Sequence, residues 1–126
     1  MNLKLLISTD FFIIKFKIQQ IISISNLIAD RLEDSSSVMI CLEDEWDETA
    51  QITSTVELLL DSYYRTMEGF RMLIQREWQS MVHRFTRRNN PTFDDQTGFA
   101  PIFLQFLDVV HQVIRFYLKI KLTLSH

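Results

Sequence analysis

Apolar residues recur every three or four positions in several stretches of the chain, which is the spacing of one helix face. This spacing predicts helices over Ile18–Leu32, from about Thr49 to Leu60, over Phe70–Met81 and over Ile102–Ile114. Val38–Leu42 is instead a short continuous apolar run between polar segments, and it predicts a buried strand. The order helix, strand, loop and three helices indicates part of an α/β domain.

The first 17 residues are apolar but interrupted, and they form an extension without a predicted role. Lys4, Asp10, Lys15 and Lys17 divide them into pieces shorter than the ~20 apolar residues of a membrane-spanning helix. Asp10 also breaks the apolar centre that a secretory signal requires. We therefore expect residues 1–17 to be a buried or irregular extension.

The helix with the clearest pattern is Phe70–Met81, whose apolar face contains a single polar residue, Glu77. Trp78 lies on the same face and is expected in the core. Pro101 is well placed as the first residue of the last helix, and Ile102–Ile114 is apolar nearly all round, which predicts burial.

Composition narrows the possible functions. The 126 residues suit one small domain, and the net charge of −3 excludes a globally basic nucleic-acid binder. One cysteine excludes a disulfide framework and a multi-thiolate zinc site. His83, His111 and His126 are too scattered for a metal site, and His83 is expected to form a structural hydrogen bond. We predict no metal and no cofactor.

Charge is divided unevenly along the chain. Residues 1–60 carry a net charge of −6 and residues 61–126 a net charge of +3. Asp30–Glu48 holds eight acidic residues against one arginine, and Tyr63–Arg88 holds six arginines. Arg84, Arg87 and Arg88 form a basic cluster that would suit acidic lipid headgroups. Because Asp94 and Asp95 lie nearby in the sequence, the cluster is more typical of a solvated face.

A strand that ends in a loop and opens a helix is the plan of an anion site, because helix N-terminal N–H groups attract negative charge. Cysteine-dependent phosphatases place a cysteine there, then five residues, then an arginine; the thiolate attacks phosphorus and the arginine binds its oxygens. With Cys41 as nucleophile the arginine position is Asp47, and with Leu42 it is Glu48. Neither register gives a catalytic pair.

The loop is also strongly acidic. At an effective dielectric near 20 and a distance of ~5 Å, each carboxylate repels a unit of phosphate charge by about 3 kcal/mol. The same carboxylates would make Cys41 a poorer nucleophile, and we expect Cys41 to be a small apolar residue on the buried strand. The acidic residues are Glu43, Asp44, Glu45, Asp47 and Glu48.

Cys41–Gln51 resembles the myotubularin signature, His-Cys-Ser-Asp-Gly-Trp-Asp-Arg-Thr-Ala-Gln. In this alignment Leu42 falls on the nucleophilic cysteine and Glu48 on the arginine, while Glu45 replaces the glycine. Cys41 falls on the preceding histidine. The matching positions are Asp44, Trp46, Asp47, Thr49, Ala50 and Gln51.

Further motifs carry the same resemblance, and they lie in Leu58–Thr66, Glu68–Phe70, Glu77–Trp78, His83–Phe85 and Pro101–Asp108. The resemblance implies a partial phosphatase-like domain over residues 18–113, followed by a divergent segment over residues 114–126. The implied fold is the α/β protein tyrosine phosphatase fold, here mostly helical, with one strand leading into a degenerate phosphate loop. We call that loop the phosphate-loop segment; it consists of Leu42, Glu43, Asp44, Glu45, Trp46, Asp47 and Glu48.

Leu42 and Glu48 make the segment similar to the catalytically inactive branch of the family, the SET-binding factors with a DENN module. The resemblance then implies a pseudophosphatase that is not an enzyme and has no catalytic residue. It would act as a scaffold or regulator of active myotubularin phosphoinositide 3-phosphatases in membrane trafficking. Rab-pathway partners would be reached through segments outside this chain. The implied location is cytoplasmic, with peripheral contact to endosomal membranes.

Two alternatives stay open. The chain is an active phosphoinositide phosphatase with an atypical loop and a cation supplied from elsewhere, or it is a truncated product without independent function. A lone strand would leave its backbone groups unpaired, and this favours the second alternative.

Overall fold

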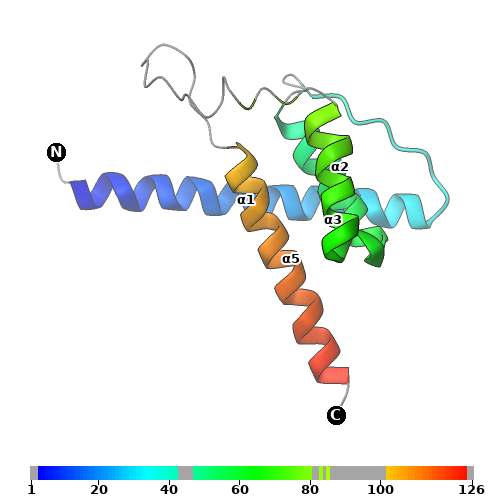
Figure 1. The fold of residues 1–126 in the computed structure, drawn as a ribbon. Helices are drawn as coiled ribbons and strands as arrows, with labels where there is room; N and C mark the ends of the chain where they lie inside the picture. Colours follow the sequence, from blue (N-terminus) through cyan, green and yellow to red (C-terminus); the bar gives the residue numbers. More distant parts are fainter. Residues whose placement is uncertain (1–2, 43–46, 81–82, 84, 86–101, 125–126) are drawn as a thin grey trace.

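The structure, a computed structural model, describes residues 3–42, 47–80, 83, 85 and 102–124, and it is built from helices (Figure 1). A long helix α1 is followed by helix α2, a short 3₁₀ helix η1, helix α3, a π-helix η2 that continues α3, and a final helix α5. Their bounds are Leu3–Glu33, Glu48–Leu60, Ser62–Arg65, Met67–Leu73, Ile74–Ser80 and Ile102–Leu124.

Helix α1 ends at the polar turn that the sequence predicts. Ser35 adopts a left-handed conformation with φ of 62°. Its N–H donates to the Leu32 carbonyl at 3.0 Å, and the Ser36 N–H donates to the Arg31 carbonyl at 3.0 Å. This pair of bonds is the Schellman arrangement, which satisfies carbonyls left open at a helix end.

The predicted strand is absent, and the α/β fold class is therefore wrong for the described part of the chain. Residues 36–42 form no regular secondary structure, and Met39 is 86 % exposed. A strand needs a neighbour to pair its backbone N–H and C=O groups, and none of the described segments pairs with residues 36–42. The apolar run Val38–Leu42 indicated burial, but it contains no information about whether a second strand is present.

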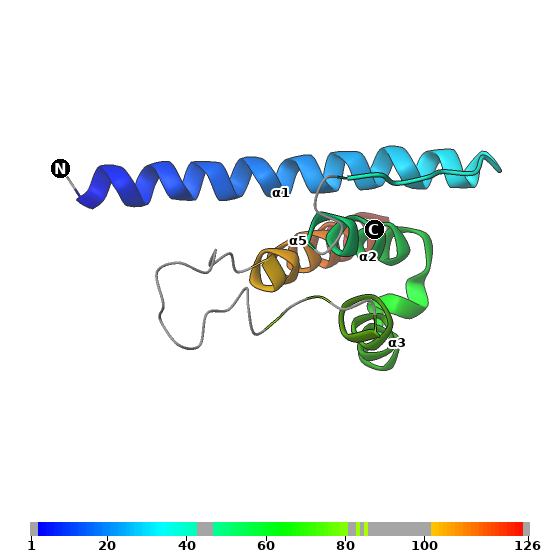
Figure 2. The same cartoon turned by 90° about the horizontal axis from the view of Figure 1, so that it is seen from above.

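The helices form layers on either side of α5 and α2 (Figure 2). Ile18 and Ile21 of α1 pack against Val109 and Val113 of α5, which makes one buried cluster. Neighbouring residues of α5 pack instead against α2, α3 and η2 in a second buried cluster. The buried members of this second cluster are Ala50, Leu58, Leu73, Trp78, Phe106 and Val110. Helix α5 therefore joins the two halves of the core.

Trp78 is fully buried in the second cluster, as predicted. Its indole Nε1–H donates to Ser54 Oγ on α2 at 3.0 Å. Its ring lies 4.8 Å from the Phe106 ring and 5.0 Å from the Phe103 ring, centroid to centroid. A buried indole needs such an acceptor, because an unpaired N–H in the core is costly.

Glu77, the one polar residue on the predicted apolar face, is buried and paired. Arg76 Nε donates to Glu77 Oε1 at 2.8 Å, and Arg76 Nη2 donates to Glu57 Oε2 on α2. Burial raises the pKa of Glu57 above its ordinary value, Glu77 raises it further, and Arg76 opposes the rise. This guanidinium therefore connects η2 to α2.

A second arginine, Arg65, binds the last carbonyl groups of α2. Arg65 Nη1 donates to the carbonyls of Leu58 and Leu59, the latter at 3.2 Å, and its guanidinium lies 4.2 Å from the Tyr117 ring centroid. Tyr117 Oη also donates to the Leu59 carbonyl at 3.1 Å. These contacts tie the end of α2 to η1 and α5.

The predicted helices are confirmed, with changed limits. Helix α1 already begins at Leu3, so the expectation of an irregular N-terminal extension is wrong. Helix α5 continues to Leu124 and is not buried all round, since Leu104 is 64 % exposed. Within α1, Phe12–Glu33 is long and apolar enough to cross a membrane, a property that buried core helices and N-terminal signal sequences share.

Candidate functional site

The phosphate-loop segment connects residues 36–41 to the first turn of α2. Leu42 is half-buried, Asp47 is buried and Glu48 is exposed. The remaining candidates, Glu43, Asp44, Glu45 and Trp46, lie outside the residues that the structure describes.

Leu42 and Glu48 line one pocket of about 140 Å³ between α1, the start of α2 and the start of α5. These are the positions that align with the nucleophile and the arginine of the signature, so the structure brings the two ends of the segment together. The other lining residues are Lys17, Gln20, Ile21, Ile24, Gln51, Ile52, Ile102 and Gln105.

Lys17 is a pocket residue that the sequence reasoning missed. It comes from the N-terminal region that was left without a role, and it lines the same pocket as Glu48. No local pattern could have found it, because the pocket is formed where α1 packs beside the start of α2. The Ile18–Leu32 periodicity was its nearest signal, since it predicts which face of α1 turns inward.

Asp47 turns away from solvent and toward the core. It is the residue before α2, and its carbonyl accepts from the Gln51 N–H at 3.4 Å. Its Oδ1 lies 3.6 Å from Nδ1 of His83, and the two side chains are 8 % and 1 % exposed. His83 in turn contacts the Trp78 ring edge to face, with 4.9 Å between centroids.

The contact between Asp47 and His83 joins two motifs that lie far apart in the sequence, the phosphate-loop segment and His83–Phe85. The side chain of Asp47 fixes the start of α2 to the segment after η2, and His83 is held there by Trp78 and by Phe85, whose ring lies 4.7 Å from the imidazole. His83 is buried among aromatic rings, and its expected structural hydrogen bond stays a prediction. Sequence reasoning identified Asp47 and His83 separately, but nothing local indicated that they meet.

Cys41 does not lie where we expected. It is a free, exposed thiol next to Leu42, because the strand that would have buried it does not form. The pocket thus combines an apolar side chain at Leu42, a carboxylate at Glu48 and an ammonium at Lys17, with a thiol one residue away. Among the described residues, no group of three or more His, Cys, Asp or Glu could hold a metal ion.

The sequence matches one family over most of its length. Residues 15–120 match the family described as myotubularin-like phosphatase domain. The chain is similar to the phosphatidylinositol-3,5-bisphosphate 3-phosphatase MTMR2 of Bos taurus, with 45 % identity over 91 residues. It is 44 % identical over the same length to the protein of that name from Mus musculus. These alignments cover 70 % of the chain and 14 % of each relative.

These relatives correct one prediction from the sequence. The conclusion that the chain is not an enzyme is wrong, because the matching family is one of phosphatases and both relatives are named as phosphoinositide 3-phosphatases. That conclusion depended on Leu42 and Glu48, two positions in one segment. The similarity extends over 91 residues, and it is the broader observation.

Proposed function

Because the chain belongs to the myotubularin family of phosphatase domains and is homologous to a phosphoinositide 3-phosphatase, we propose that it acts in phosphoinositide metabolism by associating with an active family phosphatase. In this role it would tune the partner's activity. The chain spans 14 % of the length of the relatives it matches, so their full activity is also a matter of proposal for this chain.

The pocket beside α2 carries this proposal. A site that transfers phosphate needs a nucleophile and a cation facing each other. The two aligned positions in this pocket are Leu42 and Glu48, and Glu48 would repel a phosphate group. The surrounding helices are nevertheless ordered, since Asp47 and His83 connect the start of α2 to the core. Such a retained scaffold suits a role in binding another protein.

The partner and the location follow from the same proposal. The partner would be an active myotubularin-family phosphatase, and Rab-pathway proteins would be reached through segments outside this chain. We expect the complex in the cytoplasm and at the surface of endosomal membranes. Association would place the chain where the phosphatase meets its lipid substrate.

Catalysis with an atypical loop is a second candidate, and two observations favour it. Cys41 is exposed and adjoins the pocket through Leu42. Lys17 lines that pocket and would supply the cation that the arginine position lacks. In this case the Cys41 thiolate would attack phosphorus and break its bond to the inositol oxygen, which leaves with a proton from water, and a second water would hydrolyse the cysteinyl phosphate. Lys17 would bind the phosphate oxygens.

A phosphate-release assay separates the two candidates. The purified chain is incubated with phosphatidylinositol 3,5-bisphosphate alone, and then with mouse MTMR2 present. The first candidate predicts that the chain changes the rate of MTMR2 until the effect saturates, and that Cys41→Ser leaves this effect intact. Glu68→Gln, an exposed change on α3, serves as a control for handling and purity.

Two results of this assay would contradict the first candidate. Release by the chain alone that Cys41→Ser abolishes and Lys17→Gln reduces would establish the second candidate and overturn the first. No change in the rate of MTMR2 at any concentration of the chain would contradict the regulatory role.

A further inference from the structure

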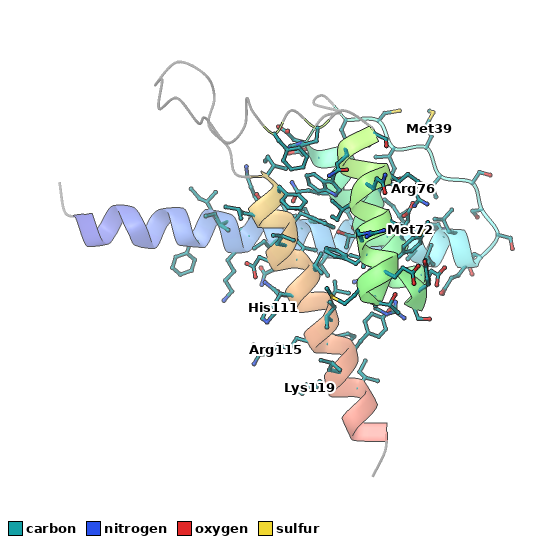
Figure 3. All side chains as sticks on the ribbon, in the orientation of Figure 1. Met39, Met72, Arg76, His111, Arg115 and Lys119 are labelled. Carbon is teal, nitrogen blue, oxygen red and sulfur yellow. The ribbon has the colours of Figure 1, made fainter. Side chains whose placement is uncertain are left out.

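A wide basic wedge lies between α1 and the middle of α5. It encloses about 680 Å³ and is open to solvent. Figure 3 shows His111, Arg115 and Lys119 following one another along the side of α5 that faces α1. Lys15 of α1 lines the same wedge, and Asp108 is the one acidic residue among its described lining. The wedge is therefore net positive.

Three exposed aromatic side chains lie on the same two helices, and one of them, Phe116, lines the wedge itself. Phe12 and Phe16 of α1 are 71 % and 60 % exposed, and Phe116 of α5 is 63 % exposed. Phe12, Lys15 and Phe16 are spaced by three and four residues, which places them on neighbouring parts of one helix face. Figure 1 shows this part of α1 extending beyond the helices that pack on the rest of it.

We propose that this surface binds a lipid bilayer whose headgroups are anionic. We call it the α1–α5 surface, and it consists of Phe12, Lys15, Phe16, Arg115, Phe116 and Lys119. Aromatic rings beside cations are the composition of helices that lie in the membrane interface, where the rings enter the acyl boundary and the cations meet headgroup phosphates. The proposal is independent of any partner phosphatase.

Other occupants fit the observations less well. A second copy of the chain would bring the same cations, Lys15 and Arg115, against each other, and like charges across an interface repel. A bilayer-spanning α1 would have to leave its packing on α2 and α5, in which Ile18, Ser25 and Ala29 are buried. Contact at the bilayer surface keeps that packing and covers only the exposed side chains.

Vesicle sedimentation with the full 126-residue chain tests the proposal. The chain should bind phosphatidylcholine vesicles that contain phosphatidylserine and should not bind phosphatidylcholine alone. Binding should weaken as sodium chloride is added, since salt screens the contact. Each cation near an anionic surface contributes about 1 kcal/mol, so Lys15→Gln with Arg115→Gln should weaken binding about 25-fold. Phe12→Ser with Phe116→Ser should also reduce it.

Two matched controls lie on α3, on the opposite side of the molecule from α1 (Figure 2). Arg71→Gln removes an exposed cation and Met67→Ser removes an exposed apolar side chain, and neither should change vesicle binding. Circular dichroism checks that the helices persist. The salt titration of the unmodified chain tests the electrostatic contact even if a variant loses its helices.

Three results would overturn the proposal. The first is equal binding to vesicles with and without phosphatidylserine. The second is that Arg71→Gln weakens binding as much as the double change of Lys15 and Arg115. The third is a dimer in analytical ultracentrifugation that Phe12→Ser disrupts, together with no binding to vesicles, which would assign the surface to a second copy of the chain.

Discussion

The hydrogen bond between Trp78 and Ser54 should carry a measurable share of the stability, because it lies in the core that positions α2. Both side chains are fully buried, and the indole donates to Ser54 Oγ at 3.0 Å. Ser54→Ala leaves the indole N–H buried without this acceptor. A lost partner of this kind costs about 1–3 kcal/mol, so we expect a loss of about 2 kcal/mol in the free energy of unfolding.

Ser25→Ala is the matched control. Ser25 is also fully buried in a helix, but its Oγ has no hydrogen-bond partner among the residues that the structure describes. Both substitutions remove one hydroxyl and give the same gain in helix propensity, so these contributions cancel. Ser25→Ala should leave the stability unchanged or raise it by up to about 1 kcal/mol.

Urea denaturation followed by circular dichroism measures both variants. At about 4 °C per kcal/mol for a chain of this size, Ser54→Ala should also lower the Tm by about 8 °C. A cooperative transition of the native chain would itself count against a truncated product without a stable fold. Equal unfolding free energies for Ser54→Ala and Ser25→Ala would refute the reasoning, because the two sites would then not differ in hydrogen bonding.

Three further changes test other parts of the fold by the same urea assay. A Cβ at Gly69 would lie 2.0 Å from the Tyr63 carbonyl oxygen, so Gly69→Ala should destabilise by about 3 kcal/mol, and an unchanged midpoint would contradict this packing. Arg65→Met removes the bonds to the last carbonyls of α2 and the stacking on Tyr117, and should cost about 2 kcal/mol; a loss below about 0.5 kcal/mol would contradict that role. Burial raises the pKa of Glu57 above 4.5, so the folded state binds a proton at Glu57 more tightly than the unfolded state does. The free energy of unfolding therefore falls as the pH rises from 4.5 through the folded pKa of Glu57. Glu57→Gln should flatten this decline just above pH 4.5 in thermal melts, and an unchanged slope would exclude Glu57 as its source.

The helices were predictable because their signals are local. The three- and four-residue spacing around Val56 placed α2 within one residue of its observed start, and the apolar face that contains Trp78 proved to be the buried one. The continuation of α3 as a π-helix over Ile74–Ser80 was not predictable, since the spacing of apolar residues around Glu77 is compatible with an ordinary helix.

The failures share a different cause, which is dependence on distant parts of the chain. Val38–Leu42 has the composition of a strand, but a strand needs a neighbour that its own residues do not specify. The same holds for the site. Leu42 and Glu48 were found from the signature, whereas Lys17 and the contact of Asp47 with His83 required the packing of helices far apart in sequence.

Complex formation between the chain and an active family phosphatase tests the central proposal most directly. The purified chain and mouse MTMR2 are mixed and followed by analytical ultracentrifugation, with the concentration of the chain varied. The proposal predicts a new species of larger size that saturates at a fixed ratio of the two proteins. Independent sedimentation of the two proteins at every concentration would contradict it.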